Sequence, residues 1–202
     1  MTPPCTIVIP IKGLRTGKTR LSAVLSDDAR FDLNSYLAER TLQTASDLNG
    51  DTNICVVSPD PEVKTIAARY SADFLLQTTD GLNPALEQAA RALPESRTVY
   101  LAADLPDLVV DDIRALADAT NIGISPDQAG RGTNALTLPT PRTIGFRFGA
   151  NSFETHCALA RQTGLQVTTI DRPGLSYDLD TETDLEAVKG WPRAADPRNV
   201  PR

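Results

Sequence analysis

The chain has 202 residues, of which 23% are charged and 41% are hydrophobic, and its net charge is −6. This length is typical of one globular domain with a substantial core, and the acidic balance argues against a polyanionic partner such as nucleic acid. No apolar run approaches the roughly 18 residues of a membrane-spanning helix, and the N-terminus lacks the pattern of a signal peptide.

The three cysteines, Cys5, Cys55 and Cys157, are far apart in the sequence. An odd number of widely spaced cysteines is typical of free thiols in a reducing compartment rather than of disulfides or a zinc site. We therefore expect three buried free thiols and a cytoplasmic location, with no membrane partner.

The first half of the chain alternates continuous apolar runs with segments of helical periodicity. The apolar runs predict strands at residues 6–11, 53–58, 73–77 and 98–103. The segments between them predict helices at residues 27–48, 62–70, 82–93 and 111–119. Strands that read as unbroken apolar runs are buried on both faces, so this order predicts a parallel sheet covered by helices.

The second half is less regular. Strand-like segments at residues 122–126, 135–139 and 166–170 surround an expected helix at residues 152–163. A loop over residues 171–177 then leads to a last expected helix at residues 181–188. We predict one α/β domain over residues 1–190, built as three layers around a mostly parallel mixed sheet, and a loosely ordered tail over residues 191–202.

A basic loop follows the first expected strand directly. It contains two glycines and four cations: Lys12, Arg15, Lys18 and Arg20. A buried strand that leads into such a loop indicates bound phosphate, and a solvated surface loop is the alternative. The spacing from Gly13 to Lys18 is one residue shorter than a P-loop requires, so we expect a triphosphate site of a different kind.

The segment from Gly130 to Ala135 matches the dinucleotide pattern G-x-G-x-x-A. An expected strand follows it instead of a helix, which argues against a dinucleotide fold. Two interpretations stay open. The segment forms either a simple hairpin turn or an anion pocket, in which Arg131 supplies charge and Thr133 and Asn134 supply neutral donors.

Three aspartates are candidates for a metal site. Asp104 ends a buried strand, where ligands bind in parallel sheets, and its carboxylate suits a hard cation such as Mg²⁺. Asp178 and Asp180 are two residues apart in an extended segment, so both side chains lie on one face and a cation would relieve their repulsion. The alternatives are a turn or cap role for Asp104 and an N-cap role for Asp180.

His156 is the only histidine, and it lies four residues after Ser152 in an expected helix. A nucleophile–base pair would fit this spacing, but we favour a phosphate- or carboxylate-binding face or a surface histidine. Triphosphate-binding cations, carboxylates for Mg²⁺ and a second anion pocket together predict phosphoryl or nucleotidyl transfer without a covalent nucleophile.

Five segments, in this order, resemble the 2-phospho-L-lactate guanylyltransferase family: IVIPIKGLRTGKTRLS, AADLPDL, GRGTNAL, FRFGANSFETH and DLDTETDL. Bacterial members of this family are described as phosphoenolpyruvate guanylyltransferases of coenzyme F420 biosynthesis. The resemblance runs from Ile7 to about Val188, and GRGTNAL followed by FRFG-x-x-S-x-x-x-H is its specific part. It implies a GT-A-like nucleotidyltransferase fold of the wider MobA-like kind, with GTP as donor, Mg²⁺ as cofactor and a small phosphorylated carboxylic acid as acceptor.

The resemblance also implies roles for single residues. Lys12, Lys18 and Arg20 would contact the GTP phosphates and act in catalysis with Asp104. The metal would bind Asp104 and one or both of Asp178 and Asp180. Further nucleotide contacts would come from Pro10, Gly13, Ser58, Gly81 and Asn83. The acceptor would bind Thr133, Gly149 and Ser152, with Asn134 nearby and with Arg131 and Arg147 as charge partners.

The first loop departs from the glycine-rich form of MobA-like enzymes, which shifts the expected phosphate contacts from backbone to side-chain cations. Another MobA-like nucleotidyltransferase and a non-catalytic nucleotide-binding module stay open as alternatives. The sequence does not choose among phosphoenolpyruvate, 2-phospho-L-lactate and 3-phosphoglycerate as the acceptor, and it leaves the oligomeric state open, a homodimer included.

Overall fold

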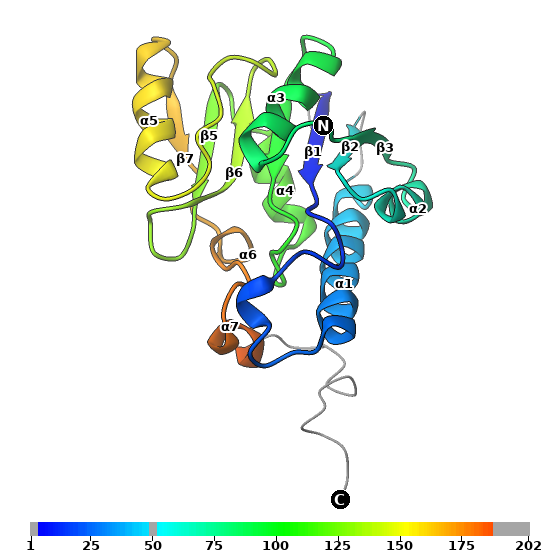
Figure 1. Cartoon of the computed structure of the whole chain (residues 1–202). Helices are drawn as coiled ribbons and strands as arrows, with labels where there is room; N and C mark the ends of the chain where they lie inside the picture. The colour runs from blue at the N-terminus through cyan, green and yellow to red at the C-terminus, as the bar shows by residue number, and fades with distance from the viewer. Residues whose placement is uncertain (1–3, 49–51, 188–202) are drawn as a thin grey trace, which may run out of the picture.

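The apolar runs form the strands of one sheet, whose central strand is buried on both faces. The computed structural model describes residues 4–48 and 52–187. Its strands are β1 (Cys5–Pro10), β2 (Thr52–Ser58), β3 (Asp73–Leu76), β4 (Thr98–Leu101), β5 (Ile122–Pro126), β6 (Thr133–Leu138) and β7 (Val167–Thr169). They are ordered β3-β2-β1-β4-β6-β5-β7 (Figure 1). The predicted α/β fold with a mostly parallel mixed sheet is confirmed.

Strand β6 is the one described strand that runs antiparallel to its neighbours, β4 and β5; the other described pairs are parallel. Leu101 at the end of β4 therefore pairs with Ala135 near the start of β6. The backbone N–H of Ala102 continues this ladder with a 2.9 Å bond to the carbonyl of Asn134. The reversal brings the segment around Thr133 beside the residues that follow β4.

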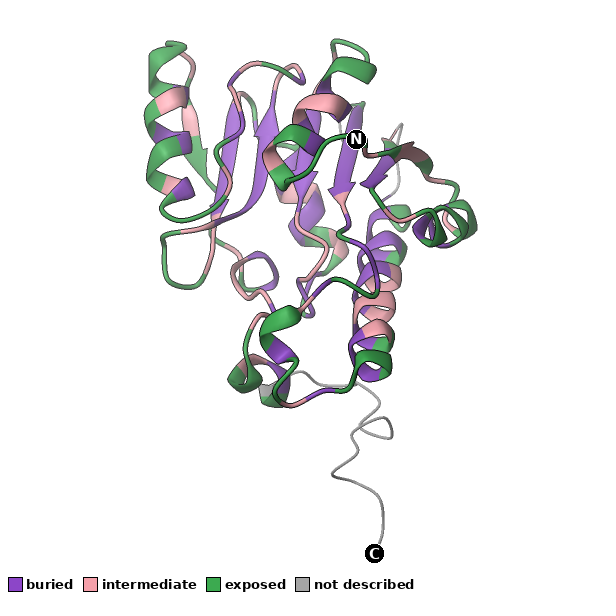
Figure 2. Cartoon of the chain, viewed as in Figure 1, coloured by how far each residue is buried: buried purple, intermediate pink, exposed green. Residues whose placement is uncertain are grey.

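Helices cover both faces of the sheet. They are α1 (Asp27–Ser46), α2 (Glu62–Arg69), α3 (Leu82–Ala92), α4 (Val110–Ala117), α5 (Ser152–Gln162), α6 (Pro173–Ser176), α7 (Glu182–Ala187) and the 3-10 helix η1 (Thr19–Leu21). Ile7 and Ile9 face one core, with α1, α2 and α4, whereas Val8 faces the other, with α3 and α5. Figure 2 shows the buried sheet between these layers. The three-layer prediction follows directly from this alternation.

A third apolar cluster ties the N-terminal loop to the last described segment. Leu21, Leu25 and Leu33 pack with Leu179 and Leu185, and all five are buried. Figure 1 shows η1, α6 and α7 close together beyond the carboxyl ends of β1 and β4. This cluster brings two parts of the sequence, separated by more than half its length, to the same edge of the sheet.

Several expected details need correction. The loop expected at residues 171–177 contains helix α6, which Pro173 begins and in which the carbonyl of Arg172 accepts from Leu175 and Ser176. Helix η1 was not expected either. Val188 and the tail expected at residues 191–202 lie outside the described residues, and so does residue 190 at the expected domain end.

The three cysteines are free and buried, as predicted. Among the described residues, no helix combines the length and the apolar character that crossing a membrane requires.

Candidate active site

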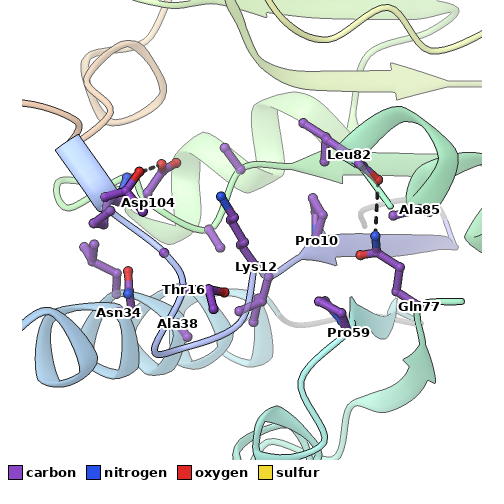
Figure 3. Close-up of a pocket in the computed structure, with 18 of the residues that line it drawn as sticks. Pro10, Lys12, Thr16, Asn34, Ala38, Pro59, Gln77, Leu82, Ala85 and Asp104 are labelled. Atoms are coloured by element: carbon purple, nitrogen blue, oxygen red, sulfur yellow. Dashed lines mark hydrogen bonds and ion pairs between the residues drawn. The ribbon is translucent and has the colours of Figure 1, made fainter. Parts of the chain in front are cut away.

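A cleft of about 750 Å³ lies at the carboxyl ends of β1 and β4, the edge where ligands bind in such sheets. The first loop, helix α1, the segment from Gln77 to Ala85, the end of β4 and Asp180 line it. Lys12 points into the middle of the cleft (Figure 3). Asp104 lies at one end, and Gln77 and Pro59 lie at the other. The cleft therefore has a cationic centre, an acidic end and an amide-bearing end.

The first loop is held from both sides, by side chains of α1 and by a side chain that follows β2. Asn34 on α1 donates to the carbonyl of Leu14 at 2.7 Å, and Asp60 accepts from the N–H of Leu14 at 2.9 Å. The buried Arg30 donates to the carbonyl of Gly17 at 3.1 Å. A Cβ on Gly17 would approach the Asn34 amide to 2.7 Å, so the close contact of loop and helix requires glycine.

Three backbone donors of the loop are satisfied within the protein. The N–H groups of Thr16 and Gly17 both donate to the carbonyl of Gly13, at 3.0 and 2.9 Å. The N–H of Leu14 is likewise taken up by Asp60, and the cations Lys12, Lys18 and Arg20 are among the residues that line the cleft. The geometry agrees with the rejection of a P-loop, in which backbone N–H groups cradle the phosphates.

A cluster of opposite charges fills the acidic end of the cleft. The Lys18 ammonium lies 2.5 Å from Asp104 Oδ2 and 3.0 Å from Asp180 Oδ1, and Arg20 contacts the other oxygen of Asp180 at 3.1 Å. Burial lowers the pKa of Lys18, but the two carboxylates outweigh it, so the net pKa is raised. Lys18 is therefore a fixed positive charge, held in a left-handed backbone conformation with φ 51°.

Asp178 and Asp180 flank Leu179, which binds the segment that follows β4. The N–H of Leu179 donates to the carbonyl of Asp104 at 3.0 Å, which places the two carboxylates on either side of a buried leucine. Burial raises the pKa of Asp178, and the charges of Asp104 and Asp180 raise it further. The repulsion among Asp104, Asp178 and Asp180 is thus one cause of the raised pKa of Asp178, and a hydrogen bond from Asn134 offsets part of it.

The alternative role of Asp180 as a helix cap is wrong. Asp184 accepts from the N–H groups of Asp180 and Thr181 at 2.9 and 2.6 Å, and the Thr181 hydroxyl accepts from the N–H of Asp184 at 3.3 Å. This is a capping box made by residues other than Asp180. Its carboxylate is left for Lys18 and Arg20.

These carboxylates suit a hard divalent cation. In the part of the chain that the structure describes, no group of three or more acidic, histidine or cysteine side chains is arranged to hold a metal ion. Instead the Lys18 ammonium lies between Asp104 and Asp180 and occupies the place of a cation. The donor set suits a divalent cation, because Asp104 and Asp180 already converge on a positive charge. A further positive charge would also relieve the repulsion that raises the pKa of Asp178.

The glycine-rich segment forms the turn between β5 and β6, which confirms the hairpin interpretation of its backbone. The Asp127 carboxylate accepts from the N–H of Arg131 at 2.8 Å, and a Cβ on Gly132 would approach it to 2.6 Å. Asn134 donates to the carbonyls of Leu175 and Ser176, and it helps to stabilise the charged form of Asp178. Its amide therefore ties α6 and the acidic segment to β6.

A second group of buried polar side chains lies beside this hairpin, at the start of α5. Thr133, Ser152 and His156 are buried, and Gly149 adopts φ +129° in the loop before the helix. Within the described residues, the Ser152 hydroxyl has no hydrogen-bond partner. The N–H of Phe153 donates to the carbonyl of Arg131 at 3.0 Å, which joins hairpin and helix. The surface position expected as one option for His156 is wrong, because helical spacing alone does not show which face is covered.

Among the residues predicted to bind the nucleotide, the structure brings together Pro10, Lys12, Lys18, Arg20, Gly81 and Asp104 along the cleft. Other predicted contacts point elsewhere. The buried Ser58 hydroxyl accepts from the N–H of Asp60, and Asn83 exchanges two hydrogen bonds with the backbone of Phe148. Gly13 is buried within the loop turn.

Gln77 and Asp80 line the cleft, and the sequence did not suggest them. The Gln77 amide nitrogen donates to the carbonyls of Thr79 and Gly81, so the amide oxygen is the atom that it can offer a ligand. The sequence could have indicated Gln77, because it directly follows β3 and so lies at the same ligand-binding edge of the sheet as Asp104.

Comparison with known proteins places the chain in a family. The family model "Guanylyl transferase CofC like" matches residues 5–189. The chain belongs to this family of CofC-like guanylyl transferases. A relative from Sphaerobacter thermophilus, named phosphoenolpyruvate guanylyltransferase, is 39% identical over 190 residues, which cover 91% of each chain. A relative of the same name from Rubrobacter xylanophilus is 40% identical over 189 residues, 90% of this chain and 92% of the other.

Solved structures support the fold of this CofC-like guanylyl transferase. A protein assigned as a nucleotide-diphospho-sugar transferase from Desulfovibrio desulfuricans has a TM-score of 0.73 at 20% identity. The match covers 97% of this chain and 90% of that protein's chain. A glucosyl-3-phosphoglycerate synthase from Mycobacterium tuberculosis, solved with Mn²⁺ and UDP, has a TM-score of 0.59 at 11% identity and covers 95% and 77%. The predicted nucleotidyltransferase-type fold is thereby confirmed.

The buried histidine of this family member predicts a loss of stability in acid. Burial, and then the charge of Arg147, lower the pKa of His156 to about 4. In the unfolded chain the histidine takes up a proton near pH 6.5. The contribution of the neutral, buried ring to the free energy of unfolding is therefore complete above about pH 6.5 and is lost as the pH falls toward 4. In urea unfolding, the stability difference between wild type and His156→Gln should be about 2 kcal/mol smaller at about pH 5 than at about pH 7.5. An unchanged difference would show that the folded histidine titrates normally.

Proposed function

We propose that this chain transfers the guanylyl group of GTP to the phosphate of phosphoenolpyruvate, with release of pyrophosphate, in coenzyme F420 biosynthesis. The observation that carries this proposal is the convergence of Lys18, Asp104 and Asp180 in a nucleotide-sized cleft. The buried polar side chains of Thr133 and Ser152 support it as the acceptor site. The names of the relatives support phosphoenolpyruvate as the acceptor. The free buried thiols agree with a reaction in the cytoplasm.

The reaction needs positioning and charge neutralisation more than a base. An oxygen of the acceptor phosphate attacks the α-phosphorus of GTP, and the bond from that phosphorus to the bridging oxygen of the β-phosphate breaks. A phosphate oxygen is already anionic at neutral pH, so no proton has to be removed before the attack. Lys12 and Arg20 line the cleft and would neutralise the charge that develops on the leaving pyrophosphate.

Asp104, with Asp178 and Asp180, would hold the divalent cation, which we expect to be Mg²⁺. When bound, the ion supplies positive charge to the phosphate oxygens at the acidic end of the cleft. Lys18 contacts two of these carboxylates, so it would orient them toward the phosphates and carry charge of its own. Asp104 lines the nucleotide cleft, and it follows β4, whose last residue pairs with Ala135 near the start of β6.

The acceptor would bind where the hairpin meets α5. The buried hydroxyls of Thr133 and Ser152 and the backbone at Gly149 offer neutral donors near a helix N-terminus, which favours an anion. Arg131 and Arg147 lie close to these residues in the sequence and would supply charge. These groups would donate short hydrogen bonds to the phosphate and the carboxylate of a small acceptor.

The test is turnover with defined substrates. The protein is incubated with GTP, Mg²⁺ and phosphoenolpyruvate, 2-phospho-L-lactate or 3-phosphoglycerate in turn, and both pyrophosphate and the guanylylated product are measured, the latter by mass. We expect pyrophosphate and product in equal amounts, with phosphoenolpyruvate as the best acceptor. Absence of product with all three acids would contradict the proposal, and a preference for another nucleotide would favour a different nucleotidyltransferase activity.

Gln77 provides a prediction about base selection. Its fixed amide oxygen can accept from the N–H groups on the edge of guanine, whereas adenine presents an acceptor there. Gln77→Leu should raise the KM for GTP about 10-fold, the worth of one lost hydrogen bond to a desolvated group, and lower the preference for GTP over ATP.

The matched control for this prediction is Gln88→Leu. Gln88 also ties this segment to α3, because it donates to the carbonyl of Leu76 and accepts from the N–H of Thr78. If loosening of the segment causes the effect, both variants should lose the preference equally. If the Gln77 oxygen selects the base, only the first should.

A further inference from the structure

His156 is buried among the residues proposed to bind the acceptor, and both of its ring nitrogens are engaged. Its exposed fraction is 0%, and the Phe148 ring packs edge-on against it at 4.8 Å between centroids. The backbone N–H of Arg147 donates to Nε2 at 3.0 Å. Nδ1 lies 3.0 Å from the hydroxyl oxygen of Thr133. The ring therefore connects the loop before α5 with the first residue of β6.

These two contacts determine where the ring proton lies. Because an N–H group donates to Nε2, that nitrogen must carry a lone pair. A neutral ring then carries its proton on Nδ1, which donates to Thr133 Oγ1. A doubly protonated ring would set two donors against each other at Nε2, and burial disfavours it as well. Neither nitrogen is left to take a proton from a substrate.

The position of the ring proton fixes the direction of the threonine hydroxyl. Since Thr133 Oγ1 accepts from Nδ1, its own hydrogen must point in another direction and is available to a ligand. Ser152 lies one helical turn before His156, on the same face of α5, and its buried hydroxyl lacks a partner among the described residues. Both hydroxyls are therefore ready to donate to one anionic group.

The loop from Phe146 to Gly149 is held from a second side. Asn83 on α3 accepts from the N–H of Phe148 at 2.8 Å and donates to its carbonyl at 3.0 Å. Gly81 and Leu82, at the start of the same helix, line the nucleotide cleft. The ring of His156 and the amide of Asn83 thus fix two consecutive residues of this loop, on the side toward the acceptor.

We propose that His156 is a positioning residue, whose neutral Nδ1-protonated ring turns the Thr133 hydroxyl toward the acceptor's anionic group and holds the Arg147 backbone in place. This inference rests on the proposed function, because it takes the buried polar side chains of Thr133 and Ser152 as the acceptor site. It assigns the histidine no proton transfer.

Kinetics of four variants test the proposal. His156→Phe should raise the KM for phosphoenolpyruvate about 10-fold and leave the KM for GTP within about 2-fold, because the loss of one oriented hydrogen bond falls on the acceptor. The glutamine amide of His156→Gln offers one acceptor and one donor, so its KM for phosphoenolpyruvate should lie much closer to that of the wild type. Thr133→Val should match His156→Phe, and the double variant should cost no more than either alone, since both changes remove the same oriented hydroxyl.

The ring itself gives a readout that does not depend on activity. The chain has a single histidine, so protein labelled with ¹⁵N-histidine shows one pair of ring resonances. We expect a protonated Nδ1 and an unprotonated Nε2 from about pH 5.5 to about pH 8 in the unmodified protein. A proton on Nε2 would overturn the proposal even if His156→Phe does not fold.

The remaining outcomes separate the two proposals. If the wild type produces no guanylylated acid, the proposed function fails, whatever the ring spectrum shows. If the wild type turns over but His156→Phe leaves the KM for the acceptor unchanged, or raises both KM values alike, the function stands and the role of His156 is wrong.

Discussion

Asp104→Asn should lower turnover of GTP and phosphoenolpyruvate by about 10³-fold, the largest loss that we expect from a single substitution in the site. Asparagine keeps the shape of the side chain and removes its charge. The change takes away a predicted metal ligand and the 2.5 Å contact with the Lys18 ammonium together. The expected measurement is the rate of pyrophosphate release at saturating substrates, because the loss should fall on turnover rather than on binding alone.

Asp107→Asn is the matched control for this substitution. Asp107 lies three residues further along the same loop, is exposed, and does not line the cleft. It should keep nearly full activity. Thermal unfolding of Asp104→Asn should show a folded protein, because the residue is partly exposed and its backbone carbonyl still accepts from Leu179. If Asp104→Asn kept a tenth or more of the activity, or if both variants lost it alike, Asp104 would not hold the metal.

The sequence was most informative where a rule about strands sufficed. A residue that follows a buried parallel strand lies at the ligand-binding edge, and this rule led to Asp104 and to the basic loop after β1. Period two in an extended segment led to Asp178 and Asp180. Both rules depend only on local backbone geometry, which the apolar runs of the sequence determine.

The direction of the amide side chains could not be predicted in this way. Asn83 and Asn134 lie near the expected sites, but their amides bind backbone groups of Phe148 and Leu175, far away in the sequence. Asn34 and Asp60 hold the basic loop through the backbone of Leu14, and no local pattern shows such a partner. Tertiary packing decides which polar group an amide satisfies, so Asn83 and Asn134 hold neighbouring segments of the site in place.

The burial of His156 had a weak signal in the sequence. Ser152, His156 and Ala160 are spaced by four residues and are all buried, so they form one covered face of α5. A small polar residue and a histidine on that face resemble a surface stripe when only composition is considered. The covering comes from Phe148 and from strand β6, which reach the helix from elsewhere in the chain.

The place of Lys18 between two carboxylates leads to a second prediction with a large effect. Lys18→Met should lower turnover by about 10²-fold, because it removes a charge fixed next to the phosphates. It should also lower the stability of the metal-free protein by about 1–2 kcal/mol. This is less than a fully buried pair would cost, because the Asp104 and Asp180 side chains are 31% and 39% exposed and water screens their repulsion.

Addition of Mg²⁺ should stabilise Lys18→Met more than it stabilises the wild type. Without the ammonium, Asp104, Asp178 and Asp180 are left with mutual repulsion that a divalent cation can relieve, so the variant should bind the ion more tightly than the wild type. A ligand that binds only the folded state raises the unfolding temperature, and the rise grows with the logarithm of its concentration relative to its Kd. The rise in unfolding temperature from EDTA to Mg²⁺ should therefore be larger for Lys18→Met than for the wild type.

Lys12→Met separates a local charge effect from a general one. Lys12 is an exposed cation of the same loop, and it points into the middle of the cleft (Figure 3). Among the described residues, the cations paired with Asp104 and Asp180 are Lys18 and Arg20 and not Lys12. The loss of Lys12 should reduce turnover but leave the Mg²⁺-dependent rise in unfolding temperature as in the wild type. A smaller rise for Lys18→Met than for the wild type would mean that the ammonium supports the ion instead of standing in its place. An equal rise in all three proteins would mean that the ion binds away from Asp104 and Asp180.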